Sequence, residues 1–212
     1  IDTAAAAQAP GVLRILTGAD WDAENYGGLP CEDLNKLRPD GSPIYQPRCP
    51  ALVSGQVKLV GDYVAFVVAE TQAQARDAAE MIAVDYAPLQ AVADIENAAA
   101  PGAPAVWPDC PDNISFVEEK GDAAAVDAAF AKADHIVRQK MVINRVTAVA
   151  MEPRGCLGDY DSRQDRYTLY TGLQNPHPLR YQIARQVFDI PETSVRVIPG
   201  DVGGSFGMRG GT

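Results

Sequence analysis

The stretch GDVGGSFGMRGGT, residues 200–212, contains the residues best suited to contact a ligand. Gly203, Gly204, Gly207 and Gly210 surround a single aromatic residue, Phe206. Glycine reaches backbone angles and close approaches that other residues cannot, so this loop can bring its backbone N–H groups against a bound group. We therefore expect a binding loop at this end of the chain.

A second potential donor, Gln174, lies where the predicted strand RYTLYTG gives way to a helix beginning at NPHP. A side-chain amide beside a helix N-terminus, together with exposed backbone N–H groups, favours an anionic group that carries oxygen atoms. The alternative is purely structural. In that interpretation Gln174 and Asn175 only cap the helix, the glycines form an irregular turn, and Phe206 belongs to the core.

Other chemistries lack the required residue spacing. The glycine loop matches neither GxGxxG nor GxxxxGK[ST], which leaves nucleotide binding with little support. His135 and His177 are far apart and have no ExxH companion, so a zinc or di-iron site is not indicated. No serine or cysteine lies in a nucleophile-elbow context. Glu152 and Arg154 in MEPRG are interpreted as a structural pair, either an ion pair or a turn brace.

The cysteines and the overall charge exclude further classes. The chain has no CxxC pair, so its four cysteines are interpreted as reduced structural residues, at positions Cys31, Cys49, Cys110 and Cys156. A net charge of -10 without clustered Lys and Arg argues against nucleic acid and against anionic membrane surfaces. No apolar run reaches the roughly 18 residues of a membrane span.

The elements that must position these residues form two predicted halves. In the first half, DYVAFVVAE at 62–70 reads as a strand buried on both faces. The helix that follows, over 71–83, starts with the Thr71 capping-box pattern, and VDY at 84–86 returns as a strand. This pattern predicts a strand–helix–strand unit. Residues 27–50 are expected to form a long surface loop.

The second half is predicted to contain a helix, a long strand, a hairpin, a second helix and a final strand, over residues 121–134, 135–146, 155–172, 175–191 and 194–200. Asp122 is expected to cap the first of these helices. Asn175 is expected to cap the second, with Pro176 at its first position. The final strand leads directly into the glycine loop.

Three segments in this order and spacing resemble one protein family: MEPRGCLGDYD, TGLQNPHPLR and GDVGGSFGMRGG. They are similar to the molybdenum-binding large subunit of the xanthine dehydrogenase, aldehyde oxidase and carbon monoxide dehydrogenase family. The first half, from VGDYVAFVVAE to VDYAPL, resembles the α/β hammerhead domain of that family. The resemblance implies an α+β fold, with a partial hammerhead domain over 1–98, a linker over 99–113, and the start of a molybdopterin-binding domain over 114–212.

The resemblance also implies an activity. Members of the family hydroxylate an aldehyde or N-heterocyclic carbon with water as the oxygen source, using molybdenum bound to molybdopterin, commonly its cytosine dinucleotide form in bacteria. Electrons pass to iron–sulfur clusters and FAD on partner domains or subunits. The expected partners are therefore those subunits, the remainder of the large subunit and a small-molecule substrate, in a higher oligomer. A cytoplasmic location is expected, with the periplasm as the alternative.

By position, Gln174 matches the family glutamine that hydrogen-bonds near the oxo ligand of molybdenum. Gly204, Ser205, Phe206 and Gly207 match the segment whose backbone lies against the cofactor, and Phe206 matches the residue that walls the substrate channel. None of these residues is expected to bind the metal directly. Ser205 replaces the glycine of the commonest pattern. Xanthine-type members continue with lysine and glutamate where this chain has Arg209 and Gly210, which disfavours a purine substrate.

The family's general-base glutamate would lie beyond the equivalent of Thr212, so no catalytic residue is expected within these residues. We therefore interpret the sequence as a piece of a longer subunit that is inactive alone. Two alternatives remain open. One is a non-catalytic assembly module, either truncated or one part of a split subunit. The other is a nucleotide-dependent enzyme, against which the loop spacing argues.

Overall fold

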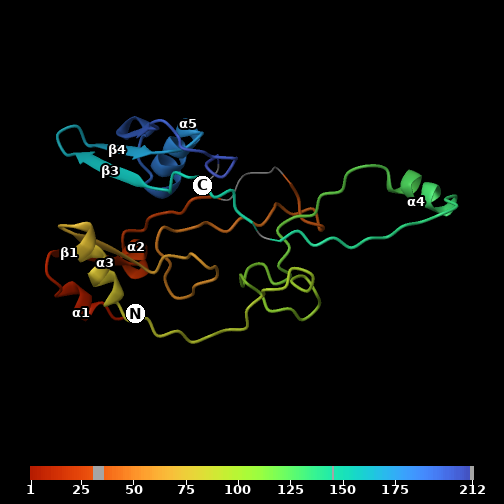
Figure 1. Cartoon of the computed structure of the whole chain (residues 1–212), viewed down its shortest axis with the longest axis horizontal. Coiled ribbons are helices and arrows are strands. Elements are labelled where there is room, and N and C mark those ends of the chain that lie inside the picture. Colours follow the sequence, from red (N-terminus) through yellow and green to blue (C-terminus); the bar gives the residue numbers. More distant parts are fainter. Residues whose placement is uncertain (31–35, 145, 211–212) are drawn as a thin grey trace.

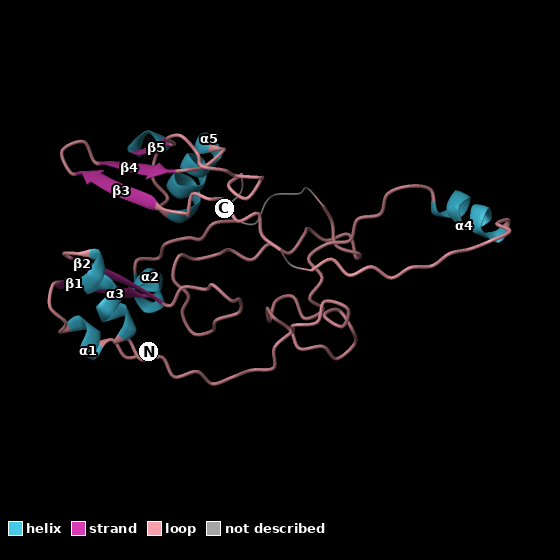
Figure 2. Ribbon diagram, in the orientation of Figure 1, coloured by secondary structure: helices cyan, strands magenta, loops and turns pink. Residues whose placement is uncertain are grey.

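The chain has two small lobes, each built on its own sheet, joined by long irregular segments (Figures 1 and 2). The structure is a computed structural model, which describes residues 1–30, 36–144 and 146–210. Cys31 and the last two loop positions therefore lie outside the described residues. Helices and strands alternate without a large parallel sheet, which confirms the expected α+β class.

The first lobe contains a two-stranded antiparallel sheet with short helices, namely α1 (Ala4–Ala7), β1 (Val12–Thr17), α2 (Gly18–Ala23), β2 (Ala65–Ala69) and α3 (Gln72–Glu80). α3 packs against β2. Its first turn is capped as expected, because the Thr71 hydroxyl accepts a hydrogen bond from the backbone N–H of Gln74. The helix predicted after the apolar strand is thus confirmed.

Two expectations for this lobe are wrong. The burial of β2 alternates along the strand, and Phe66 is 59% exposed, so β2 is not buried on both faces. Residues 84–86 form no strand, and only an isolated bridge between Asp2 and Ala83 follows α3. An apolar or β-branched run favours an extended backbone, but it does not provide a neighbouring strand to pair with. The predicted strand–helix–strand unit is therefore absent from the described residues.

The second lobe follows the predicted order closely. Its elements are β3 (Cys156–Asp161), β4 (Arg166–Thr171), α5 (Pro176–Tyr181), a π-helix (Gln182–Val187), a 3-10 helix (Glu192–Ser194) and β5 (Val195–Ile198). β3 and β4 form the expected hairpin, and β5 adds to β4 in parallel. Pro176 occupies the first turn of α5 as predicted, where its missing N–H costs nothing.

The π-helix at the end of α5 binds the first lobe through its last carbonyl groups. Its wider turn is visible in the hydrogen bond from the Phe188 N–H to the carbonyl of Ile183, five residues earlier. The Val187 carbonyl accepts from the N–H of Gly27 at 2.8 Å. A methyl group at Gly27 would lie 1.7 Å from the Gln186 carbonyl oxygen. Only glycine can approach this helix end so closely.

A row of aromatic rings continues the contact between the lobes. Tyr26 lies 5.1 Å from Trp21 and 5.3 Å from Phe188, between ring centroids, in edge-on geometry. Phe188 stacks on Tyr167 at 5.5 Å, and Tyr167 contacts Tyr160 at 4.7 Å. Such pairs contribute about 0.5–1.5 kcal/mol each beyond their buried area. The row therefore joins α2 to the β3–β4 hairpin.

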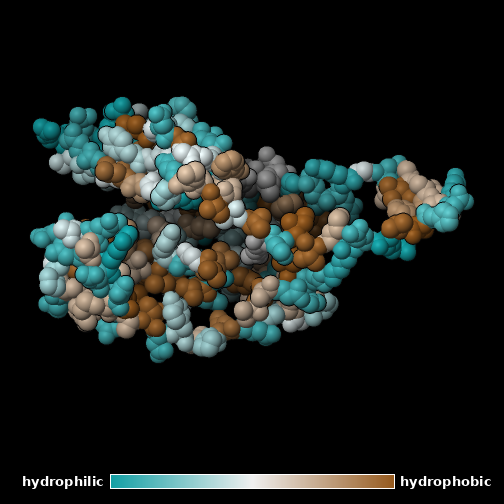
Figure 3. All heavy atoms as spheres, viewed as in Figure 1, coloured by the Kyte–Doolittle hydropathy of each residue, from teal (hydrophilic) through white to brown (hydrophobic). Residues whose placement is uncertain are grey.

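α4 (Ala123–Ala131) lies apart from both lobes, at the end of an extended arm (Figure 1). Its N-terminus is capped as predicted, because the Asp122 carboxylate accepts from the Ala125 N–H at 2.9 Å. Among the residues that the structure describes, however, no helix or strand packs on its apolar face, and Phe130 is 54% exposed. Figure 3 shows apolar atoms at the surface of this arm.

The long strand predicted over 135–146 is wrong for the described residues of that segment, which form no ladder. Its apolar side chains are exposed, and those of Val137 and Ile143 are almost fully so. β-branched residues favour extended backbone here, but no strand lies alongside to receive the hydrogen bonds. None of the helices in the described residues is long and apolar enough to cross a bilayer.

The aromatic row predicts a difference between two phenylalanines of this chain. Phe188→Ala should lower the free energy of unfolding by about 2 kcal/mol, because it removes the ring at the centre of the row. Phe130→Ala on the exposed face of α4 should change it by less than about 0.5 kcal/mol. Urea denaturation of both variants measures the difference. Equal losses would contradict docking through this row.

Candidate functional site

The glycine loop folds back from the end of β5 against residues 172–175, which follow β4. The Gln174 N–H donates to the carbonyl of Arg209 at 3.0 Å. Asn175 occupies the N-cap position of α5 as predicted, but its side-chain amide makes no capping hydrogen bond and instead donates to the carbonyl of Gly210 at 2.7 Å, which holds the loop. The two segments singled out in the sequence therefore lie in direct contact.

A buried ion pair fixes this loop to the MEPRG segment. Among the described residues, Arg209 is the only buried charged residue, with a side chain 6% exposed. Its Nη1 lies 2.7 Å from Oε2 of Glu152 and also donates to the Gly172 carbonyl at 3.2 Å. The same Glu152 oxygen accepts the N–H of Gly203 at 2.6 Å. One carboxylate thus holds both ends of the loop.

The predicted ion pair between Glu152 and Arg154 is wrong. Glu152 pairs with Arg209, while Arg154 donates to the carbonyl of Met208. Both charged residues of MEPRG therefore bind the glycine loop and do not pair with each other. A usable signal existed in the sequence, because Arg209 is the only cation among residues 199–212 and a buried loop cation needs an acidic partner.

Ser205 connects the loop to Gln174. The Ser205 hydroxyl accepts a hydrogen bond from the backbone N–H of Arg209 at 3.1 Å and donates to Oε1 of Gln174 at 2.5 Å. Among the described residues, nothing accepts a hydrogen bond from the Gln174 amide nitrogen. Sequence reasoning identified Ser205 and Gln174 separately but did not anticipate the contact between them.

The middle of the loop leaves its backbone donors without partners in the described part of the chain. Gly204, Phe206 and Gly207 have φ angles of 110°, 52° and 85°, all in the left-handed region. Holding a non-glycine residue such as Phe206 there costs about 1–3 kcal/mol. Within the described part of the chain, the backbone N–H groups of residues 204–207 have no hydrogen-bond acceptor. Phe206 is 77% exposed, which contradicts the interpretation that it is a core residue.

A cavity of about 660 Å³ lies behind the loop, between the two lobes. Leu29 and Tyr63 line it from the first lobe, and Arg154, Asn175 and Arg209 are among the residues that line it from the second. The recess between the lobes is visible in Figure 3. Its volume lies within the range of sites for small molecules.

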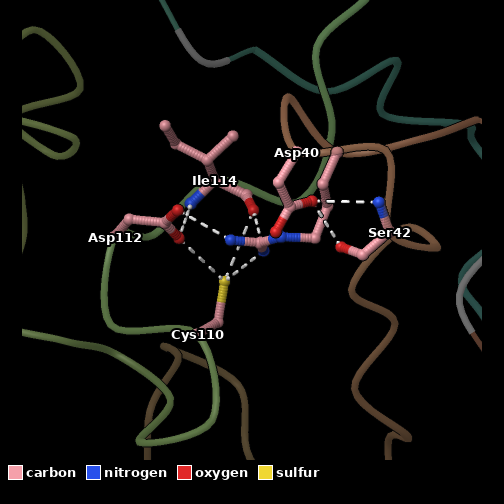
Figure 4. Close-up of polar contacts among 6 residues, drawn as sticks. Asp40, Ser42, Cys110, Asp112 and Ile114 are labelled. Carbon is pink, nitrogen blue, oxygen red and sulfur yellow. Dashed lines mark hydrogen bonds and ion pairs between the residues drawn. The ribbon is translucent and has the colours of Figure 1, made fainter.

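A second polar cluster joins residues 38–42 to residues 110–114 (Figure 4). The Arg38 guanidinium lies 2.6 Å from Asp112 Oδ2 and 3.2 Å from the sulfur of Cys110, a buried free thiol. The hydrogen bond from Arg38, reinforced by the N–H of Ile114, lowers the pKa of Asp112. The guanidinium, the carboxylate and the thiol are hydrogen-bonded to one another, so this cluster has the features of a structural brace.

This pKa shift predicts a pH dependence. Because the folded pKa of Asp112 is lowered, its stabilisation is complete above the unfolded pKa, about 3.9, and is lost as pH falls through the folded value. Asp112→Asn should therefore lower the urea midpoint at pH 7 but not at pH 2. Exposed Asp109→Asn provides the matched control, and a D112N effect independent of pH would contradict the assignment.

Removing the buried cation should loosen the glycine loop. Arg209→Ala leaves Glu152 without its partner, and we expect a loss of about 2–3 kcal/mol, reduced because the Glu152 side chain is 35% exposed to water. Arg209→Lys should lose less, since it keeps the charge but not the guanidinium fork. Arg196→Ala on β5 is the exposed control. Urea denaturation checks this order, and an R209A loss no larger than that of R196A would contradict it.

Two models of known protein families match this chain, one in its first part and one in its second. Residues 1–90 match the family model described as aldehyde oxidase and xanthine dehydrogenase, a/b hammerhead domain. Residues 106–212 match the model described as molybdopterin cofactor-binding domain. The chain belongs to the aldehyde oxidase and xanthine dehydrogenase family of molybdenum-binding large subunits.

Three similar proteins illustrate the match. The large subunit of nicotine 6-hydroxylase from Paenarthrobacter nicotinovorans is 32% identical over 99% of this chain and 24% of its own length. The carbon monoxide dehydrogenase large chain of Afipia carboxidovorans is 31% identical over 100% of this chain and 26% of its own. The solved structure of quinoline 2-oxidoreductase from Pseudomonas putida 86 has a TM-score of 0.82 at 31% identity, covering 98% of this chain and 25% of its own. The chain spans about a quarter of the length of these relatives.

Proposed function

We propose that this chain is part of a molybdopterin-dependent hydroxylase that oxidises an aldehyde or N-heterocyclic carbon with water as the oxygen source. Family membership supports the class. The observation that carries the proposal is a set of donors without acceptors among the described residues, formed by the N–H groups of residues 204–207 and the amide nitrogen of Gln174. We assign the hammerhead domain to residues 1–98 and the start of the cofactor-binding domain to residues 114–212.

The residues present fit an anionic, oxygen-rich cofactor. Left-handed Gly204 and Gly207 leave successive N–H groups uncovered, which is the arrangement of an anion-binding nest. In the proposal, these groups and the Gln174 amide bind and orient molybdopterin. The proposed form of the cofactor is the cytosine dinucleotide. The bound cofactor supplies the redox chemistry. Exposed Phe206 forms one wall of the path by which substrate enters.

Arg209 is consistent with a substrate other than a purine. Its guanidinium is paired with the Glu152 carboxylate and donates to the Gly172 carbonyl, so it holds the loop and its charge is already balanced within the chain. The neighbouring Gly210 has no side chain to recognise one. Discrimination among aldehydes and heterocycles would then come from the residues around Phe206 and from polypeptide that completes the site.

The complete enzyme requires more than these residues. The general base that activates water is proposed to come from the remainder of the large subunit, and iron–sulfur and FAD subunits to accept the electrons, in a cytoplasmic complex. The exposed apolar side chains of the α4 arm and of residues 135–146 support association with further polypeptide. The same exposure would also suit one part of a split subunit, which is the second candidate. Either way, the 212 residues alone should be inactive.

The test begins with the protein in its native source. We expect a chain well above 22.6 kDa that carries about one molybdenum and one pterin, measured by mass spectrometry and by fluorescence of the oxidised pterin. It should reduce a dye in the presence of an aldehyde or heterocycle. A 22.6-kDa chain that binds molybdenum only with a second polypeptide would indicate the split subunit. A purified protein without molybdenum would contradict both candidates.

Gln174→Ala tests whether the Gln174 amide takes part in catalysis. Loss of a hydrogen bond to a charged group predicts a decrease in kcat/KM of about 10- to 100-fold. Gln164→Ala, in the exposed β3–β4 turn, changes the same residue type outside the site and should leave kcat/KM unchanged. Equal kinetics for the two variants in the full-length enzyme would argue against a role for Gln174.

A further inference from the structure

The Gln174 carboxamide carries an acceptor oxygen and a donor nitrogen, and only the oxygen is hydrogen-bonded among the described residues. Its oxygen accepts the hydrogen bond from the Ser205 hydroxyl. Its nitrogen, which carries two donors, contacts no acceptor among the described residues. With its oxygen occupied, an exposed amide in this orientation presents only donors to a ligand.

A second hydrogen bond of the Ser205 hydroxyl favours donation to the Gln174 oxygen. It already accepts the backbone N–H of Arg209 at 3.1 Å, so its own proton is directed to another acceptor. The Arg209 backbone is in turn fixed by its side-chain ion pair with Glu152. The orientation of the Gln174 amide is therefore connected, through Ser205, to the buried anchor of the loop.

The opposite amide orientation is less favourable. With the amide rotated by half a turn, its nitrogen would donate to the Ser205 oxygen, which already accepts from Arg209. The hydroxyl proton would then lose the Gln174 oxygen that accepts it. The Gln174 carbonyl oxygen would face the ligand and would repel an anionic group.

We propose that Ser205 is a positioning residue that holds the Gln174 carboxamide with both N–H donors toward the anionic cofactor. This inference rests on the function proposed above. It gives a specific role to the residue at which this chain departs from the glycine of the commonest family pattern. A glycine at position 205 would leave the Gln174 amide free to rotate.

The test uses the full-length, cofactor-loaded enzyme and four variants: S205A, S205T, Q174A and the double variant S205A/Q174A. S205A should lower kcat about 10-fold with KM within about twofold, as for residues that orient a cofactor ligand. S205T keeps the hydroxyl and should restore at least half of wild-type kcat. In the Q174A background, S205A should have no further effect. Ser162→Ala in the exposed β3–β4 turn is the matched control.

A second readout is independent of turnover. The molybdenum(V) electron paramagnetic resonance spectrum of S205A should shift toward that of Q174A, while molybdenum content stays at the wild-type level. Wild-type kinetics and spectrum in S205A would overturn the role of Ser205, as would an additive loss in the double variant. If the wild-type enzyme itself carries molybdenum, such a result leaves the proposed function intact. A wild-type enzyme without molybdenum would overturn both.

Discussion

The ion pair between Glu152 and Arg209 is the interaction on which the geometry of the candidate site depends. The glycine loop has few apolar side chains of its own, and Phe206 points into solvent, so burial of apolar surface contributes little to its shape. Directional polar contacts replace it, at Gly203, Gly172 and Ser205. In a poorly solvated position such contacts are strong when complete and costly when broken. The loop is therefore either held in one conformation or not held at all.

The sequence predicted elements well where the information is local. The caps at Thr71 and Asp122 and the entry of Pro176 into α5 depend on residues within one turn of each other, and the β3–β4 hairpin pairs two strands that follow each other directly in the sequence. The wrong predictions concern elements that depend on residues distant in the sequence. The strands expected at 84–86 and 135–146 needed a neighbour from elsewhere in the chain, and none lies beside the described residues. Extended backbone is a local preference, but a sheet is not.

The candidate site shows the same division. Gln174 and the glycine loop could be identified from residue types, because amides beside helix starts and clustered glycines have recognisable uses. Their hydrogen-bonded partners could not, since Ser205 and Gln174 are separated by 31 residues and Arg209 and Glu152 by 57. The charge pattern of MEPRG suggested a local pair, whereas the only buried cation among the described residues, Arg209, lies far along the chain. A cofactor-binding role for these residues remains a prediction.

The π-helix at Gln182–Val187 makes the joining of the lobes sensitive to residue number more than to residue identity. A turn closed by hydrogen bonds over five residues contains one residue more than the α-helical turn it replaces. Deleting any one residue there would close the turn as regular α-helix, with each carbonyl accepting from the N–H four residues later. The carbonyl groups of Val187 and Gln186 that meet Gly27 and Arg48 would then be displaced from these partners, although the Arg48 side chain was unchanged. Homologous chains should accordingly tolerate substitutions in this turn far better than changes in its length.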